Sequence, residues 1–529
     1  MGPHATHEPT SGEYDWIIIG SGFGGSVSAL RLVEKGYKVL IIEKGRRFQP
    51  NDYPKTNWDL KRWMWMPKAG MKGLFSLRFF PHITIASGVG YGGGSLVYAN
   101  TLPIPKDDFF EAESWGHLAS WKQELEGHYK TAHTMLGATE NERITYVDRM
   151  MESIAKDIGR EDSFHPSKVA VYFGKSGVTV PDPYFDGKGP ERTGCNSCGG
   201  CMLGCRFGAK NTLDKNYLWL AEQAGLHVRT ETQVKAVRPA EGGYVVEAED
   251  SLTNLGKRSY TFRSKKVIFS AGVLGTMDLL LKMRSDNRGL PNLSERLGEY
   301  VRTNSESLIA VVSKNPDRDL SKGIAIGSII HTDDHSHVEP VRYPAGSGFF
   351  RIMAAPHLEG QTLTGRFASL IKKTVTKPVD IFRALTVKDY AKQTVIMLYM
   401  RSLEGSIRFT RGILGQLTTQ LSDGPAPTAS IPEATELANR MAEKIDGVPL
   451  SMATESLLNI PTTAHILGGS CMGKNDDEGV IDADHQVFNY PGLYVIDGSA
   501  VSANPGVNPS LTITALAERA MSRIPDAPK

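Results

Sequence analysis

The sequence lacks any long apolar run and carries almost no net charge. No stretch reaches the about 18 uninterrupted apolar residues that a membrane-spanning helix requires. Residues 1–16 contain neither a basic segment nor an apolar core, so a secretory signal is not expected. The formal net charge of +2 gives no reason to expect nucleic acid as a partner. These absences favour a cytoplasmic location.

Cysteine is also scarce, and its few copies are unevenly placed. Of the 5 cysteines, Cys195, Cys198, Cys201 and Cys205 share one short segment, and the remaining one is Cys471. Structural disulfides are normally spread along the chain to close longer loops, so this clustering argues against a disulfide framework. Glycine, by contrast, is abundant at 54 copies, and many of these fall in two short runs. Such runs indicate a backbone that approaches another group closely.

The first glycine run follows a predicted buried strand at 14–19, which is rich in isoleucine. Gly20 permits a tight turn, Gly22 allows the backbone to approach a pyrophosphate, and Gly25 allows a helix to pack closely on the strand. The pyrophosphate would lie at the helix N-terminus, where free N–H groups favour negative charge. A second predicted strand ends at Glu43, which is placed to accept hydrogen bonds from ribose and argues against a 2′-phosphate. The unit predicts a dinucleotide site.

Three later segments narrow the choice of dinucleotide. Residues 87–98 form a second glycine-rich run, and residues 266–277 are typical of a strand that leads into a helix. Near the C-terminus, residues 493–499 lead into residues 506–512 and a final predicted helix. Together these motifs resemble the glucose–methanol–choline (GMC) oxidoreductases, and most closely their cholesterol-oxidase-like branch. The middle of the chain, roughly 311–451, carries little of the resemblance.

The resemblance implies an α/β fold, α+β overall. It consists of a Rossmann-like FAD-binding domain and a substrate domain built on an antiparallel sheet covered by helices. The FAD-binding domain is expected at 12–110, 190–310 and 452–525, the substrate-binding domain at 111–189 and 311–451, and flexible termini at 1–11 and 526–529. FAD is expected to bind non-covalently, because the second glycine run contains no histidine for the covalent link of some family members.

The same resemblance assigns residues to the cofactor. The ADP half would be held by Gly20, Gly22, Gly25 and Glu43, with Val234 on the adenine side. The remaining contacts are expected from Gly88, Gly92, Gly93, Gly94 and Ser95 along the pyrophosphate and isoalloxazine, from Gly272 at another point of backbone approach, and from Asp497 and Gly498 at the ribityl chain and pyrophosphate. Pro509 is expected at the first position of the final helix, whose positive end would stabilise negative charge on the reduced flavin.

A catalytic pair is expected at His465 and Asn508. Members of the family place a histidine in an H-x-x-G-G/T-C segment and an asparagine or histidine some way downstream, and His465 and Asn508 match this pattern. A neutral imidazole accepts or orients the hydroxyl proton of an alcohol while hydride leaves carbon for flavin N5. Asn508 would donate a hydrogen bond to the substrate oxygen.

One departure concerns the substrate. Cholesterol oxidases carry a buried glutamate that moves the steroid double bond after oxidation. In the segment expected to correspond, 348–356, Arg351 stands where the acid is expected, and no other acid lies between Glu339 and Glu359. Double-bond isomerisation is therefore doubtful.

The cysteine run has the spacing of a bacterial ferredoxin segment, except that Arg206 replaces the usual proline. Some sugar-oxidising GMC dehydrogenases carry an iron–sulfur cluster near this part of the chain. An iron–sulfur cluster could use Cys205 locally, bind through three thiolates only, or take Cys471 as its fourth ligand. A structural zinc and a set of reduced, packing thiols are the alternatives.

The sequence thus predicts an FAD-dependent alcohol oxidoreductase that acts on a bulky apolar alcohol such as a 3β-hydroxysteroid and passes electrons to O2 or an external acceptor. The alternatives are an iron–sulfur-containing sugar or polyol dehydrogenase and a non-catalytic, redox-sensing flavoprotein. Two segments, 61–80 and 363–400, combine apolar and basic residues, the second broken at Pro378. They indicate either core-packing elements with extended lysines or a lid that contacts membrane lipid.

Overall fold

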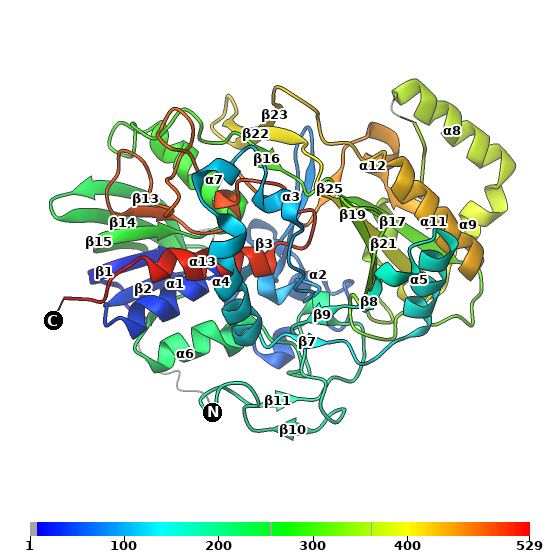
Figure 1. Cartoon of the computed structure of the whole chain (residues 1–529), viewed down its shortest axis with the longest axis horizontal. Helices are drawn as coiled ribbons and strands as arrows, with labels where there is room; N and C mark the ends of the chain where they lie inside the picture. The colour runs from blue at the N-terminus through cyan, green and yellow to red at the C-terminus, as the bar shows by residue number, and fades with distance from the viewer. Residues whose placement is uncertain (1–7, 254–255, 361, 529) are drawn as a thin grey trace.

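The computed structural model describes residues 8–253, 256–360 and 362–528. Two large sheets organise the chain (Figure 1). The first consists, in spatial order, of β12 (His227–Arg229), β2 (Val39–Ile42), β1 (Ser11–Ile19), β15 (Ser259–Phe269), β14 (Gly243–Asp250) and β13 (Thr232–Ala240), with β26 (Leu493–Val495) paired to β15. The strands from β12 to β15 and β26 run parallel, and β13 and β14 form antiparallel pairs. This parallel core confirms the Rossmann-like prediction.

The first sheet is stabilised by apolar strands buried between helices. Residues such as Ile17, Ile18 and Leu40 are fully buried, as expected for parallel strands covered on both faces. The helices of this half are α1 (Phe23–Glu34), α3 (Asp107–Phe110), α4 (Trp121–Met135), α6 (Tyr217–Gln223), α7 (Gly272–Arg284) and α13 (Ser510–Ser522). Helix α13 packs against both α1 and α4. The stretch containing α4, which the expected division assigns to the substrate domain, therefore shares the core of the first sheet.

The second sheet is antiparallel. In spatial order it consists of β20 (Ala354–Pro356), β24 (Gly447–Met452), β17 (Ser307–Ser313), β21 (Thr394–Arg401), β19 (Ser336–Val341), β18 (Ser328–His331) and β8 (Phe164–Pro166). Helices α5 (Tyr146–Asp157) and α11 (Pro432–Ile445) cover one face, where Met151, Met441 and Val338 share a buried cluster. The opposite face is turned toward the first sheet's glycine-rich end. This architecture confirms an antiparallel sheet covered by helices, whereas the exact domain boundaries stay a prediction.

Short elements connect the two sheets. They are β5 (Phe75–Phe79), β6 (Thr84–Gly88) and β25 (Thr462–Thr463) in one small sheet, β16 (Val301–Arg302), β22 (Ser406–Arg411) and β23 (Leu417–Leu421) in another, and the strand pairs β3 (Trp65–Met66) with β4 (Met71–Lys72), β7 (Thr139–Glu140) with β9 (Lys168–Val169), and β10 (Thr179–Val180) with β11 (Arg192–Thr193). The remaining helices are α2 (Leu60–Trp63), α8 (Leu363–Thr376), α9 (Pro378–Thr386), α10 (Tyr390–Gln393) and α12 (Ala453–Leu458). No helix of the described residues is long and apolar enough to cross a membrane.

Candidate active site

The turn after β1 is built around three glycines, two of which leave no room for a Cβ. Gly20 has a φ of +97°, and a Cβ there would lie 2.3 Å from the carbonyl oxygen of Ser270. A Cβ on Gly25 would lie 2.1 Å from the carbonyl oxygen of Gly20, so this glycine lets α1 pack against the end of β1. A Cβ on Gly22 would meet nothing closer than 4.0 Å outside its neighbours, which leaves room for a ligand beside the backbone.

Glu43 lies at the end of β2 and is nearly fully buried. Its Oε2 accepts hydrogen bonds from the backbone N–H and the hydroxyl of Ser21, and its Oε1 accepts one from the Gly45 N–H. The carboxylate therefore holds the glycine turn in place. Glu43 and Val234 also line a cavity of about 260 Å³. The role in ribose binding that the sequence assigns to Glu43 stays a prediction.

The second glycine run packs directly onto the first. A Cβ on Gly93 would lie 2.6 Å from the Cα of Gly22. Gly88, Gly93 and Gly94 line the cavity walls. Gly92 and Ser95 have a different place: the Gly92 N–H donates to Ser21 Oγ, and Ser95 Oγ donates to the Gly92 carbonyl and accepts from the Leu213 N–H. Gly92 and Ser95 therefore stabilise the loop, whereas the neighbouring glycines line the cavities.

Two adjoining cavities run along these glycines. The larger, of about 370 Å³, is lined by Asp497, Gly498 and Pro509, among others. It shares lining residues Gly22 and Gly272 with the smaller, Val234-lined cavity. An elongated dinucleotide fits this arrangement, with its ADP half along the smaller cavity and its flavin ring in the larger. Gly272 has a φ of +69° and nothing within 4 Å of a Cβ, as a point of close backbone approach to FAD requires.

Asp497 and Pro509 border the flavin end. Asp497 is buried, which raises its pKa, although hydrogen bonds from Ser499 and Thr276 partly offset this effect. Pro509 differs slightly from its expected place. It caps α13, which begins at Ser510, so it precedes the first helical position. The N-terminal end of α13 still faces the larger cavity through Pro509 and Ser510.

His465 lies at the wall of the larger cavity, on the segment after β25. Its Nδ1 is 2.7 Å from Oε2 of Glu306, whose side chain is fully buried. The other oxygen of Glu306 accepts a hydrogen bond from the Ala464 N–H at 2.7 Å. Burial by itself would lower the pKa of His465, but the charge and hydrogen bond of Glu306, aided by Glu339, raise it above the ordinary value. With Nδ1 engaged, Nε2 is the nitrogen available to a substrate.

Asn508 lines the same cavity and approaches a second buried acid. Its Nδ2 donates to Oε2 of Glu339 at 3.3 Å, and Glu339 on β19 is fully buried. The Asn508 Oδ1 has no hydrogen-bond partner among the described residues. The structure thus brings His465 and Asn508, which are far apart in sequence, to one cavity, each beside its own buried carboxylate.

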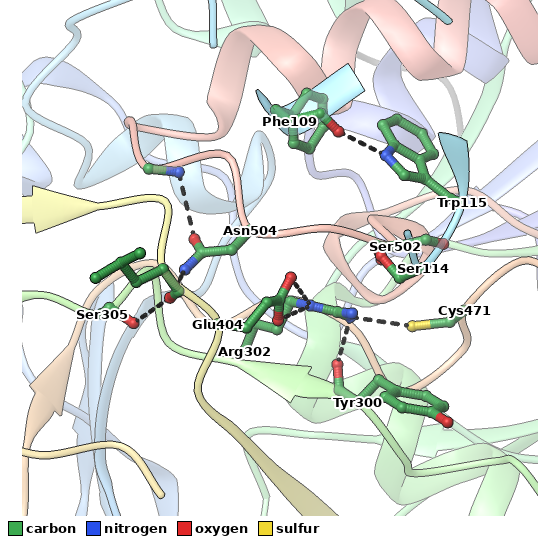
Figure 2. Close-up of polar contacts among 12 residues, drawn as sticks. Phe109, Ser114, Trp115, Tyr300, Arg302, Ser305, Glu404, Cys471, Ser502 and Asn504 are labelled. Carbon is green, nitrogen blue, oxygen red and sulfur yellow. Dashed lines mark hydrogen bonds and ion pairs between the residues drawn. The ribbon is translucent and has the colours of Figure 1, made fainter. Parts of the chain in front are cut away.

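The segment leading to Asn508 is anchored by polar contacts from several elements (Figure 2). Asn504 donates from Nδ2 to the Leu403 carbonyl and accepts from the Gly506 N–H at Oδ1. Nearby, the almost fully buried side chain of Arg302 binds Glu404 and the Tyr300 carbonyl, and its Nη1 lies 3.5 Å from the Cys471 sulfur. The backbones of Arg302 and Leu467 also exchange hydrogen bonds, which tie the His465 segment to β16.

Beyond His465 and Asn508, the walls of the larger cavity are mostly apolar. Phe75 on β5 stacks on the buried Trp63 with ring centroids 4.7 Å apart, and Phe350 packs edge-on to both. Leu398 on β21 and Met452 at the end of β24 line the second sheet's side. The segment 61–80 therefore forms part of the wall. Arg351, by contrast, donates to the Val387 carbonyl and stacks over Tyr390, and it does not line the cavity.

The cysteine run lies around a separate, small cavity lined by all four of its cysteines, and Cys471 is not among the lining residues. Cys195, Cys201 and Cys205 pack in a cluster with valine and phenylalanine side chains. Burial raises the pKa of Cys201 to about 12. Among the described residues, no group of three or more His, Cys, Asp or Glu side chains is arranged to hold a metal ion. The structure therefore does not support the metal site predicted at Cys195, Cys198, Cys201 and Cys205. It does not support Cys471 as a further ligand, because the Cys471 sulfur faces Arg302.

Comparison with known proteins identifies the family. Two family models described as GMC oxidoreductase match residues 189–295 and 407–517, and a model of the NAD(P)-binding Rossmann-like domain matches residues 18–55. A cholesterol oxidase of Acinetobacter baumannii is 43% identical over 526 residues, which cover 97% of this chain and 94% of the relative. The chain belongs to the GMC oxidoreductase family. It is an FAD-dependent enzyme that oxidises alcohols.

Other members of the GMC family show the range of the likeness. A cholesterol oxidase of Mycobacterium tuberculosis (strain ATCC 25618 / H37Rv) is 45% identical over 531 residues, covering 97% of this chain and 91% of the relative. A 2-methyl-1,2-propanediol dehydrogenase of Mycolicibacterium austroafricanum is 24% identical, covering 96% and 94%. Among solved structures, pyridoxine 4-oxidase from Mesorbium loti superposes with a TM-score of 0.61 at 14% identity, covering 96% of this chain and 98% of that one, which shows a shared fold.

Two buried acids beside His465 and Asn508 belong to no sequence motif. They are Glu306, just before the mostly apolar β17, and Glu339, the single acid of β19. A lone acid in such a strand is a usable signal, because a buried carboxylate needs a partner of its own.

Proposed function

We propose that the enzyme oxidises the 3β-hydroxyl of a steroid, or a similarly bulky apolar alcohol, to a ketone. The observation that carries this proposal is the larger cavity, whose mostly apolar walls meet His465 and Asn508 beside the glycines expected to hold the flavin. The relatives named cholesterol oxidase support the same substrate class. A sugar or polyol would need polar walls, which disfavours the alternative of a sugar dehydrogenase.

The chain's own groups divide the reaction between them. The glycines that line the two cavities would hold FAD, which would supply the acceptor for the hydride of the alcohol carbon. Neutral His465 accepts the hydroxyl proton at Nε2, while Glu306 holds the ring by Nδ1 and stabilises the charge that forms. Asn508, held by Glu339, donates to the substrate oxygen from the other side. The apolar walls exclude water and orient the hydrocarbon body of the substrate.

The substrate proposal predicts selective reduction of the flavin by sterols. Cholesterol or another 3β-hydroxysteroid should bleach the flavin absorption anaerobically, with a kcat/KM at least about tenfold above that for glucose, because a hydrocarbon body gains binding energy from apolar walls and a sugar does not. Stopped-flow absorbance measures this rate. Equal or faster reduction by glucose would contradict the steroid assignment, and no reduction by any alcohol would favour a non-catalytic flavoprotein.

The product of the same assay decides isomerisation. The doubt about this step rested on the absence of an acid in 348–356, and Glu339 supplies a buried carboxylate from just outside that segment, beside Asn508. A conjugated enone product, recognised by its ultraviolet absorption, would show that the double bond moves. An unconjugated ketone would show oxidation alone. Oxygen consumption in parallel distinguishes O2 from an external acceptor.

We further propose that α8 and α9 contact membrane lipid. Several of their apolar side chains are exposed, with Phe367 64% and Phe382 67% accessible, although Ala384 on α9 is buried. The helices lie at the edge of the molecule, beyond the second sheet (Figure 1). Basic residues on the same helices, among them Lys372 and Arg383, would attract an anionic surface.

The lipid proposal predicts binding to anionic vesicles that depends on these two aromatic side chains. The double variant Phe367→Ser, Phe382→Ser should sediment with phosphatidylserine-containing vesicles at least about tenfold less, because two large apolar side chains no longer enter the interface. Ile413→Ser is a matched control, since Ile413 is fully exposed on the loop between β22 and β23. Unchanged sedimentation of the double variant would contradict the contact.

Iron–sulfur ligation by the cysteine run stays a prediction of its spacing. Its only support is the sequence pattern. Anaerobically purified protein is expected to contain stoichiometric iron and acid-labile sulfide if the prediction holds, with loss of both in Cys198→Ser. Flavin without iron or zinc would instead make the thiols packing groups, and would favour O2 as the acceptor.

A further inference from the structure

A row of histidines leads from Glu339 to the edge of the second sheet. On β19, His337 and Glu339 are two residues apart and so lie on the same face of the strand. His337 on β19 pairs directly with His331 on the neighbouring strand β18. On the other side of β18, His165 of β8 pairs with Ile329, which is two residues before His331 and so lies on the same face. These registers place the three histidines and Glu339 on one face of the second sheet. Leu398, which pairs with Glu339 across β19 and β21, is on the same face and lines the larger cavity.

The members of this row are close to one another. The His165 and His331 ring centroids are 5.6 Å apart, and those of His331 and His337 are 5.9 Å apart. His337 Nε2 lies 3.5 Å from Oε1 of Glu339, whose other oxygen accepts from Asn508. His337 is buried, whereas His165 is exposed. The row therefore extends from the hydrogen-bond partner of Asn508 to a side chain exposed to solvent.

The polar atoms along the row are the ones left without partners. Within the described residues, no hydrogen bond is made by Oδ1 of Asn508, Oε1 of Glu339, Nε2 of His337 or Nδ1 of His331. Buried polar atoms nearly always have a partner, and ordered water serves where the protein offers none. These four atoms follow one another along one face, and no other hydrogen bond of the described residues engages them, as is required of groups that pass a proton on.

Charged groups surround the row mainly at its outer half. Burial, together with the neighbouring His337, Lys106, His165 and Arg160, lowers the pKa of His331 to about 3. Lys106 donates to the Asp333 carbonyl, and Arg160 donates to the His331 carbonyl and pairs with Asp334. At its inner end the row faces Glu339, and Tyr399 of β21 lies opposite Val338. His331 is therefore neutral, with one ring nitrogen able to accept a proton and the other able to donate one.

We propose that Glu339, His337, His331 and His165 form a proton relay between the active site and solvent. The proposal rests on the proposed alcohol oxidation. In that reaction the C–H bond breaks with its electron pair as hydride goes to the flavin, and the O–H bond breaks with its proton going to His465. The proton then passes from His465 to Glu339, whose partner Asn508 lines the same cavity, and on to the imidazoles in turn, each taking it on one nitrogen and releasing the proton of the other. It leaves from the exposed His165 to bulk water.

The relay predicts that proton release becomes slower than flavin reduction when the row is broken. In a stopped-flow experiment above the ordinary histidine pKa of about 6.5, flavin bleaching by the steroid is recorded together with a pH-indicator dye. His331→Phe should slow the dye signal at least about tenfold relative to bleaching, and free imidazole should restore it, because positioned acid–base groups typically contribute 10²- to 10⁴-fold. His335→Gln, on the same β18–β19 connection but bonded to Asp108, should release the proton at the unaltered rate.

The exposed end of the row provides a second, independent variant. His165→Gln leaves the packing intact because this side chain is on the surface, and it should also delay the dye signal, with rescue by imidazole. If proton release and flavin bleaching coincide in time in His331→Phe, the relay is overturned. If that variant loses its flavin, the same coincidence in His165→Gln overturns the relay. Absence of bleaching in the unaltered enzyme would contradict the proposed alcohol oxidation and not the relay.

Discussion

Replacing His465 by glutamine is expected to lower kcat for alcohol oxidation by about 10²- to 10⁴-fold, the usual contribution of a positioned general base. His465 lines the cavity expected to hold flavin and substrate, and its Nε2 is the nitrogen left open by the Glu306 contact. Glutamine fills similar space and can orient a hydroxyl, but it cannot take up the proton. Anaerobic reduction of the bound flavin by a sterol measures the loss directly.

The His465→Gln protein should keep its flavin, because the glycine turns that line the cofactor cavity are untouched. His133→Gln is a suitable control: His133 lies on α4 and bonds the Leu102 carbonyl, away from the cavity. It should reduce flavin at the unaltered rate. Full sterol turnover by His465→Gln, with normal flavin content, would disprove the assignment of His465 as the base.

The substitution Glu306→Gln is expected to lower kcat by about 100-fold or more and to move the acid limb of the pH–rate profile to lower pH. Glu306 raises the pKa of His465, and only the neutral imidazole acts as a base, so the rate of the unaltered enzyme rises as pH rises through that elevated pKa. Without the Glu306 carboxylate the pKa of His465 falls, and the acid limb of the profile moves to lower pH with it. The plateau also falls because the ring loses its fixed tautomer, as when the aspartate that orients a catalytic histidine is changed to asparagine.

A second buried acid provides the control for Glu306. Burial raises the pKa of Glu455 to about 8, so this carboxyl group is mostly protonated at neutral pH, and Glu455→Gln exchanges one neutral group for another. Glu455 accepts a hydrogen bond from the Thr462 N–H, and the side-chain carbonyl of glutamine can accept the same bond. The pH–rate profile of Glu455→Gln should keep its acid limb in place. A Glu306→Gln profile that also stays in place would show that Glu306 does not control the titration of His465.

Much of the cofactor site was determined by local sequence. A strand, a glycine turn and a helix form one continuous unit, so Gly20, Gly22 and Gly25 could be assigned their roles from spacing, and the structure places them as backbone geometry demands. The same local logic located the break between α8 and α9 at Pro378. Such features depend on neighbours a few residues away, which a sequence displays directly.

Only the tertiary structure decided which acids lie beside His465 and Asn508. Glu306 is 159 residues from His465 along the chain, and Glu339 is 169 residues from Asn508, so no spacing rule connects them. In the segment 348–356, where the resemblance predicts an acid, the side chain of Arg351 donates to the Val387 carbonyl and does not line the cavity. Long-range pairing of β19 with β18 and β21 sets which side chains face inward, and the resulting field, not the local sequence, sets the pKa of His465.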